Sequence, residues 1–351
     1  MKTNILVTAS LLSLVICQSS VGQGPLVPPG APAPTMKTLL QVEPRTPISS
    51  LPVFIGQSGS YYLTDNFTIG VGQDYGIFIS ANNVTIDLNG FTIRSVDPTN
   101  ANIGIRIDTS PFAEFHDITI LNGHIVGNVV TNGGIYTGSG FGYGIKSFGN
   151  PRNVRVAGVT VSGCLYDGIR IGIDDSTTVE SCTVSMVGGF GIAACSVTKC
   201  VAFECGLAGI AATTASDCVG ISNSSYPGLN AYSAHNCVGK SASGMGLGCN
   251  IANNCTGVSS GGVGLFALIA NNCWGQSSSS YGVNGIIANN SFGASVSGIG
   301  LRCVGGTAGT GIATGCYGES VNSVGLNAYI ANGCVGVGPT PISVSYKFNM
   351  P

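Results

Sequence analysis

The sequence predicts an all-β protein, a single-stranded parallel β-helix (β-solenoid) of about twelve coils, from three observations. Glycine accounts for 54 of 351 residues and charged side chains for only 28 (13 Lys+Arg and 15 Asp+Glu), which disfavours helical bundles because glycine costs about 1 kcal/mol inside a helix. Within one repeat, Leu247, Cys249 and Ile251 alternate with Gly248 and Asn250, which is the two-residue period of a half-buried strand. The third observation is a glycine followed by leucine or valine that returns every 18 residues: Gly228-Leu229, Gly246-Leu247, Gly264-Leu265, Gly282-Val283 and Gly300-Leu301.

The overall composition argues against several other classes of protein. A hydrophobic content of 44% is too high for a disordered chain. The net charge of −2 and the pI of about 5.8 give no basic surface for nucleic acid, so no nucleic-acid partner is expected. Beyond the N-terminus, no segment approaches the twenty uninterrupted apolar residues of a transmembrane helix, so no membrane span is expected.

Residues 1–22 are predicted to be a secretory signal peptide. Lys2 precedes an apolar run from Ile5 to Cys17, and Ser20-Val21-Gly22 places small residues before a cleavage site. A lipoprotein signal using Cys17 is disfavoured because no small residue directly precedes that cysteine. We therefore expect a secreted or extracellular protein, or one held at the cell surface.

Residues 23–52 are predicted to be an extended linker. This stretch contains eight of the 15 prolines of the chain, and proline favours extended, solvated backbone.

Residues 53–205 are predicted to form the first coils, which are longer and carry loops. Each coil begins with glycine and isoleucine, and the steps between these starts are 28, 40, 24 and 23 residues. Further strands follow, such as Asn83 to Ile86 and Gly90 to Ile93. The coil starts are Gly76-Ile77, Gly104-Ile105, Gly144-Ile145, Gly168-Ile169 and Gly191-Ile192.

The run from Val84 to Ile93, preceded by Tyr62-Leu63-Thr64 and by Gly76 to Ile79, resembles the N-terminal coils of the pectin-lyase-like superfamily of right-handed parallel β-helix proteins. The resemblance covers about residues 53–340 and implies a right-handed helix. It implies no single activity, because that superfamily includes polysaccharide lyases, glycoside hydrolases, epimerases, tailspikes and adhesins. The catalytic signatures of its polygalacturonases and alginate epimerases are missing from this sequence.

Residues 206–338 are predicted to form regular 18-residue coils, with a cysteine column that begins before them. Two states of these thiols are considered: a buried free-thiol ladder, which we favour, and inter-coil disulfides. Neighbouring Cα atoms about 4.8 Å apart fall in the disulfide range, but parallel in-register side chains meet the required torsion poorly. The column is Cys182, Cys200, Cys218, Cys237, Cys255, Cys273, Ser291, Cys316 and Cys334.

Residues 339–351 are predicted to form a capping strand. Ile342, Val344, Tyr346 and Phe348 alternate with polar residues. Such a strand would cover the last coil, since an exposed end of a solenoid invites aggregation.

The densest group of ionisable residues in the loop-bearing coils is Asp167, Arg170, Asp174 and Asp175. These four are the candidate catalytic residues, because carboxylates beside an arginine can bind calcium and lower the pKa of a sugar α-proton. Asp174 and Asp175 are the candidate calcium ligands; no other cofactor is expected. The alternative is a loop cluster whose charges are solvated or paired. His124, aligned with Phe91 and Val159, is expected to be a packed or rim residue.

Two classes of function follow. The first is a structural or polysaccharide-binding solenoid, whose partners would be extracellular polysaccharide, the cell envelope or further copies of the chain. The second is a divergent polysaccharide lyase or another carbohydrate-active enzyme that uses the N-terminal coils. The regular coils are nearly uncharged, which favours the first class, whereas the acidic group beside Arg170 favours the second.

Overall fold

The computed structural model describes residues 43–108, 115–149, 151–173, 176–305 and 310–350. The chain divides into two units, Met1–Pro44 and Arg45–Pro351. The predicted signal peptide, and the predicted linker as far as residue 42, lie outside the described residues. Strand β1 (Thr46–Ile48) pairs with β3 (Gly59–Leu63), so the β-structure of the second unit begins inside the range 23–52.

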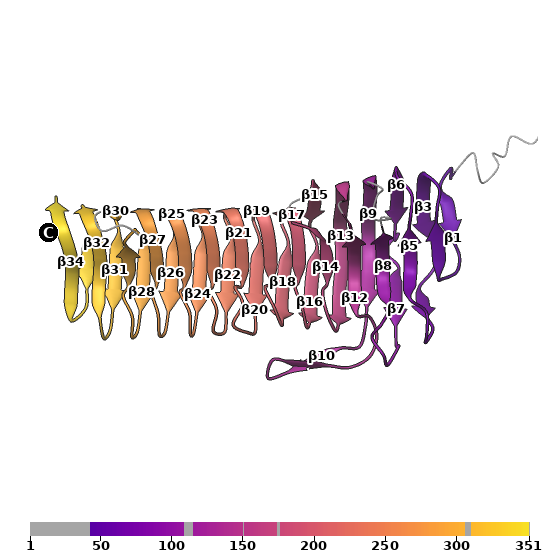
Figure 1. Cartoon of the computed structure of the whole chain (residues 1–351), viewed down its shortest axis with the longest axis horizontal. Coiled ribbons are helices and arrows are strands. Elements are labelled where there is room, and N and C mark those ends of the chain that lie inside the picture. Colours follow the sequence, from indigo (N-terminus) through magenta and orange to yellow (C-terminus); the bar gives the residue numbers. More distant parts are fainter. Residues whose placement is uncertain (1–42, 109–114, 150, 174–175, 306–309, 351) are drawn as a thin grey trace, which may run out of the picture. The chain divides into compact units, whose positions relative to one another are not determined.

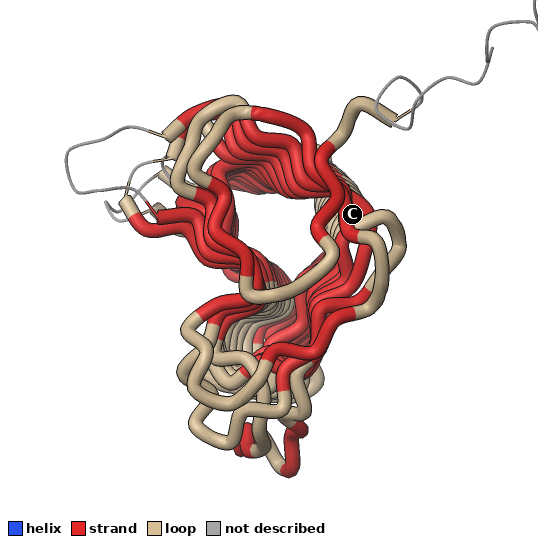
Figure 2. The backbone as a smooth tube through the Cα atoms, turned by 90° about the vertical axis from the view of Figure 1, so that its right-hand side faces the viewer, coloured by secondary structure: helices blue, strands red, loops and turns tan. Residues whose placement is uncertain are grey.

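The second unit is a parallel β-helix, as the repeat predicts. All pairings among its described strands are parallel except that of one hairpin, and each strand pairs with its counterpart in the next coil. Leu229 pairs with Leu247, and Leu247 with Leu265, so successive coils stack in register. Viewed end-on, the coils superimpose around a common axis (Figure 2). The described part of the chain contains no helix with the length and apolar character needed to cross a membrane.

Each N-terminal coil has three faces, which we number in the order in which the chain passes through them. The first face contains β2 (Val53–Ile55), β5 (Tyr75–Ile79), β8 (Ile103–Asp108), β12 (Tyr143–Phe148) and β14 (Ile169–Gly172). The second contains β1, β3, β6 (Val84–Asp87), β15 (Thr177–Glu180) and the first halves of β9 (His116–Val126) and β13 (Arg152–Cys164).

The third face contains the second halves of β9 and β13 together with shorter strands. These are β4 (Phe67–Ile69), β7 (Thr92–Ser95), β16 (Thr183–Val187), β18 (Val201–Cys205), β20 (Val219–Ser222), β22 (Val238–Ser241), β24 (Thr256–Ser259), β26 (Trp274–Ser277), β28 (Phe292–Ser295), β31 (Tyr317–Ser320) and β33 (Val335–Val337).

In the later coils, strands run across the first and second faces together, since β17 pairs with both β14 and β15. They are β17 (Ile192–Thr198), β19 (Ile210–Ser216), β21 (Leu229–His235), β23 (Leu247–Asn253), β25 (Leu265–Asn271), β27 (Val283–Asn289), β32 (Val324–Asn332) and β34 (Thr340–Phe348). One coil instead has a separate strand on each of the two faces, since β27 pairs with both β29 (Leu301–Cys303) and β30 (Ile312–Thr314). A hairpin of β10 (Val130–Asn132) and β11 (Ile135–Thr137) projects between β9 and β12 and packs against β16 (Figure 1).

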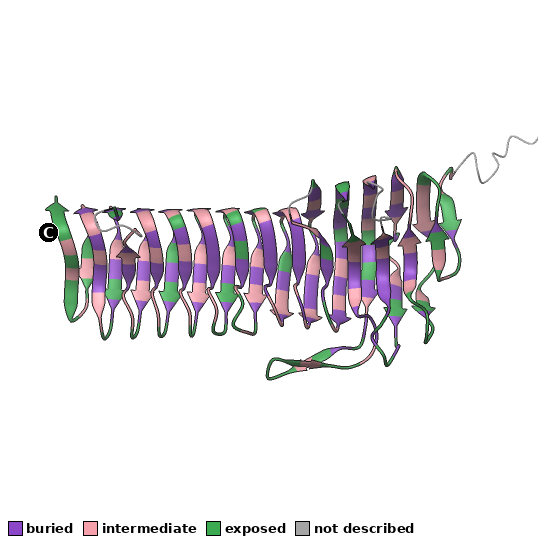
Figure 3. Ribbon diagram, in the orientation of Figure 1, coloured by how far each residue is buried: buried purple, intermediate pink, exposed green. Residues whose placement is uncertain are grey.

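Along the chain, the inward-facing side chains become smaller, from isoleucine in the early coils to alanine and glycine in the later coils. Ile77, Ile79 and Ile105 are fully buried in the early coils, and alternation of buried and outward residues continues along the later strands (Figure 3). At Gly257 a Cβ atom would lie 2.2 Å from the carbonyl oxygen of Gly264, so the third face of a regular coil leaves no space for a side chain there. Inward alanines fill the second face of these coils: Ala234, Ala252, Ala270, Ala288, Ala313 and Ala331.

The asparagine column marks a corner of the coil that needs left-handed backbone. Asn236, Asn254, Asn272 and Asn290 all have φ between 47° and 53°, a conformation that asparagine tolerates better than most residues. Gly315 and Gly333 occupy the same corner in later coils.

The residue after this corner points inward and belongs to the cysteine column. All 13 cysteines in the described ranges are free thiols, and all but Cys195 are buried. The Cys218 thiol donates to the backbone oxygen of Ser216 at 3.0 Å. Outside the column, burial raises the pKa of Cys249 on β23 to about 12. Of the two states considered, the structure has the free-thiol ladder.

Strand β34 continues the stack in register with β32. Its Ile342 and Val344 pack against the core, and beyond it the Met350 sulfur accepts a hydrogen bond from the Cys334 N–H at 3.2 Å. Tyr346 and Phe348 on the same strand are exposed.

Candidate functional site

Three cationic side chains stand in one row on the first face. Arg106 on β8, Lys146 on β12 and Arg170 on β14 are paired in register. Each follows an inward isoleucine in the sequence Gly-Ile-X, so the alternation of the strand turns X outward. Because parallel strands lie about 4.8 Å apart, the three side chains form what we call the cationic strip.

Aromatic rings line the cationic strip. The Arg106 Cζ atom lies 5.1 Å from the ring centroids of both Phe78 and Phe148. The Lys146 ammonium is 3.9 Å from the centroid of Tyr143. Cations over ring faces are attracted by the ring quadrupole, so these rings position the charges.

Asp167 is a buried acid in an otherwise apolar column. It precedes Gly168 just as Tyr143 precedes Gly144 and Phe190 precedes Gly191, and it is only 4% exposed. Its Oδ2 lies 3.4 Å from the Lys146 ammonium and 3.2 Å from Nη1 of Arg170. Its Oδ1 accepts the backbone N–H of Phe190 at 3.0 Å.

The backbone opposite Asp167 is shaped around its carboxylate. A Cβ atom on Gly189 would lie 2.3 Å from Asp167 Oδ1, which a fixed carboxylate would not accommodate. Glycine at position 189 therefore makes space for the acid. The carboxylate holds Lys146 and Arg170 in place as their shared counter-charge.

Burial changes the proton affinity of two groups at the strip. Loss of hydration lowers the pKa of Lys146, and the charge of Asp167 partly opposes this change. Burial also raises the pKa of Tyr143, and the negative charge of Asp167 adds to that effect. The Lys146 side chain is 13% exposed, whereas that of Arg170 is 48% exposed, so Arg170 is the cation most open to a ligand.

The structure describes two of the four candidate catalytic residues predicted from the sequence. Asp167 and Arg170 form an ion pair at the strip. Asp174 and Asp175 lie outside the described residues, so the candidate calcium site stays a prediction. Within the described ranges, no three His, Cys, Asp or Glu side chains come together as metal ligands.

Sequence reasoning missed Arg106 and Lys146. Both stand at the X position of the coil starts Gly104-Ile105 and Gly144-Ile145, as Arg170 does after Gly168-Ile169. A cation at the same position of three successive coils was the available signal.

The two histidines of these coils do not join the strip. His116 receives a hydrogen bond from the Asn82 amide nitrogen at Nε2 (3.0 Å), and its Nδ1 lies 2.7 Å from Asp117. His124 was expected to be a packed or rim residue level with Phe91 and Val159; it is not packed, because it pairs with Thr92 and Thr160 and is exposed on the third face. Aligning Gly123 with Gly90 and Gly158 shifts the register by one residue, because Gly123 pairs with Val159 and not with Gly158.

No family model and no curated protein matches the sequence. Two solved structures are similar to this chain. The A-module of a mannuronan C-5 epimerase from Azotobacter vinelandii is 11% identical, with a TM-score of 0.39, over 83% of this chain and 89% of that chain. The Dettilon tailspike protein is 10% identical, with a TM-score of 0.31, over 87% of this chain and 60% of that chain. At these TM-scores neither likeness carries an argument about activity, and the parallel β-helix rests on the strand pairing described above.

Proposed function

We propose that this protein is a secreted or cell-surface β-helix that binds an acidic polysaccharide along the cationic strip. The observation that carries the proposal is the in-register row of Arg106, Lys146 and Arg170. A polymer with a carboxylate on successive sugars presents repeated charge, and a stack of coils presents repeated cations. Arginine suits such a ligand because its planar fork can bind a carboxylate with two hydrogen bonds.

The geometry favours binding over catalysis. The Asp167 carboxylate already accepts from Lys146, Arg170 and the Phe190 N–H, and Asp108 is paired with Arg106. A general base must be free to take a proton from the substrate, whereas these acids are held as counter-charges.

The regular coils would serve as an uncharged scaffold in this proposal. Their strands carry few charged residues. The last residues of β23, β25 and β27, which directly precede the asparagine corner, form a hydrogen-bonded ladder, with Asn271 donating to Asn253 and Asn289 donating to Asn271 at 2.9 Å. This surface suits contact with the cell envelope or with another copy of the chain.

Calorimetric titration with polygalacturonate, alginate and neutral dextran tests the proposal. We expect saturable binding of the two polyuronates that weakens with salt, and about a tenfold loss of affinity in Arg170→Gln, since a charge-assisted bond contributes about 1.5–3 kcal/mol. The matched control is Arg155→Gln, which removes an exposed arginine paired with Glu180 on the second face. Equal binding of dextran, or equal loss in both variants, would contradict the proposal.

An eliminative polysaccharide lyase is the second candidate, and the lowered pKa of Lys146 beside Tyr143 favours it. A lyase would produce unsaturated sugars, and the ultraviolet absorbance of these products can be measured with and without calcium. If the wild-type protein has this activity, and Lys146→Ala or the double variant Asp174→Ala and Asp175→Ala loses it, the lyase function would replace the binding function proposed above. Absence of product from both polyuronates would reject the lyase.

A further inference from the structure

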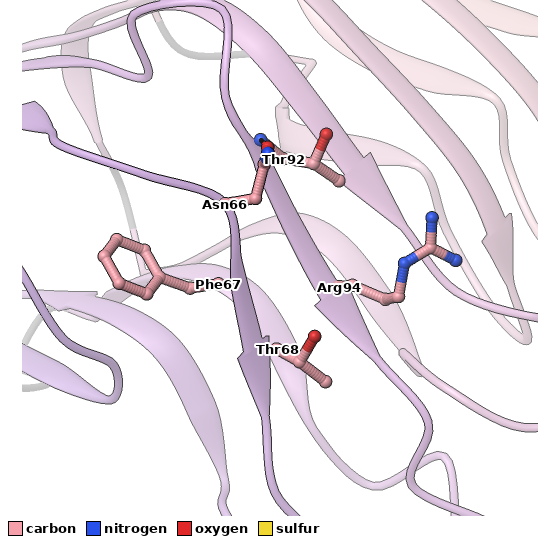
Figure 4. A pocket seen from close by; sticks show the side chains of 5 residues that line it. All are labelled: Asn66, Phe67, Thr68, Thr92 and Arg94. Carbon is pink, nitrogen blue, oxygen red and sulfur yellow. Dashed lines mark hydrogen bonds between the residues drawn. The ribbon is translucent and has the colours of Figure 1, made fainter.

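A shallow hollow of about 290 Å³ lies on the third face, away from the cationic strip. Its lining comes from two neighbouring coils: Asn66, Phe67 and Thr68 at β4, and Thr92 and Arg94 on β7 (Figure 4). Thr68 and Arg94 are paired in register, so the guanidinium and the two threonine hydroxyls are brought to the same small area of surface.

The polar side chains of the hollow can all donate hydrogen bonds. Asn66 Oδ1 accepts the Thr92 backbone N–H at 2.8 Å, which fixes the orientation of the amide and leaves its NH2 group to donate. Neither that NH2 group nor the hydroxyls of Thr68 and Thr92 have a hydrogen-bond partner within the described ranges. No carboxylate lines the hollow; the nearest in sequence, Asp65, accepts the Asn66 backbone N–H at 2.7 Å.

Arg94 differs from the other arginines of the N-terminal coils. Arg106, Arg155 and Arg170 are each ion-paired, whereas Arg94 is exposed and has neither an acidic nor an aromatic partner among the described residues. An uncompensated guanidinium beside neutral donors presents positive potential and unused hydrogen-bonding capacity at one place.

We propose that this hollow binds an oxyanion group, namely a sulfate, phosphate or carboxylate. The Arg94 fork would hold two oxygens. Asn66, Thr68 and Thr92 would donate hydrogen bonds to the remaining lone pairs of the oxyanion. This site is separate from the polysaccharide site proposed above, because it lies on the third face and contains no residue of the strip. The protein would therefore contact acidic ligands on two faces.

The test is calorimetric titration of the full chain with inorganic sulfate, inorganic phosphate and acetate at constant ionic strength, and then with a sulfated and a desulfated oligosaccharide of the same backbone. We expect saturable binding of at least one anion, weakened about tenfold or more in Arg94→Gln and less in Arg94→Lys. The order of the three anions, and the effect of desulfation, identify the source of the oxyanion.

Lys240→Gln is the matched control, since Lys240 is an exposed cation on β22 of the same third face. It should leave affinity unchanged, as should Arg170→Gln, which separates this site from the cationic strip. The proposal is overturned if none of the anions binds saturably, or if Arg94→Gln and Lys240→Gln weaken binding equally. Loss of polyuronate binding in Arg170→Gln with the hollow unaffected would support both sites independently.

Discussion

The carboxylate of Asp167 lies 3.4 Å from the ammonium of Lys146, and both side chains are largely withdrawn from solvent. The acid comes from the coil after the one that carries the lysine, so the pair connects two neighbouring coils at the cationic strip. An acid at this position in place of the tyrosine or phenylalanine of the adjacent coils keeps the buried charge of Lys146 compensated.

Replacing Asp167 by asparagine should destabilise the protein by on the order of 3 kcal/mol, because Lys146 would keep a buried charge without its partner. The midpoint of urea unfolding measures the change. Asp108→Asn is the control, since the Arg106–Asp108 pair is more exposed and its loss should cost less than about 1 kcal/mol. Equal midpoints for wild type and Asp167→Asn would show that the pair does not stabilise the fold.

Asp97 should make stability sensitive to acid. Hydrogen bonds from the Thr99 hydroxyl, from the Thr99 N–H and from the Gly72 N–H lower the pKa of this carboxyl in the folded state. A depressed carboxyl pKa stabilises the fold above the unfolded value and loses that effect as pH falls through the folded value. Below about pH 4, the melting temperature of wild type should therefore fall more steeply than that of Asp97→Asn. Parallel curves for the two proteins would count against this assignment.

The left-handed backbone at the asparagine corner predicts an order of stability among variants at Asn254. Its φ of 53° is unfavourable for a residue with a Cβ atom and no locally bonding side chain, so Asn254→Ala should cost about 1 kcal/mol. Asn254→Gly should be close to neutral, because glycine already occupies this corner at Gly315 and Gly333. Urea unfolding of the three proteins decides the order, and an alanine variant as stable as the glycine variant would contradict it.

The thiol ladder predicts how cysteines react in the native and unfolded chain. Without reductant, a thiol reagent should modify Cys195 alone among the 13 described cysteines in the native protein, because the other 12 are buried. The same reagent in denaturant should modify all 13. Mass spectrometry counts the labels, and a deficit in the unfolded chain would reveal disulfides.

The sequence predicted the regular coils well because their inward and outward positions repeat without interruption. Leu229, Leu247 and Leu265 are separated by a constant step, and their stacking follows directly from it. The cationic strip was only partly predictable, because Arg106, Lys146 and Arg170 are separated by unequal steps of 40 and 24 residues. Because the loops between these strands differ in length, the sequence alone does not show that the three residues are in register, whereas the strand pairing does. His124 was displaced by one position in the alignment because Gly123 and Gly158 do not stand at equivalent positions of the corner.

The in-register stack also bears on how such a chain changes over evolutionary time. A regular coil such as that of β23 and β24 pairs with the coil before it and the coil after it, as in solenoids generally. Duplicating or deleting one 18-residue unit would therefore keep the same kind of strand pairing between neighbouring coils and change the number of coils. Such a change in the gene would lengthen or shorten the β-helix by one whole coil and leave the N-terminal coils and their charged surface unchanged.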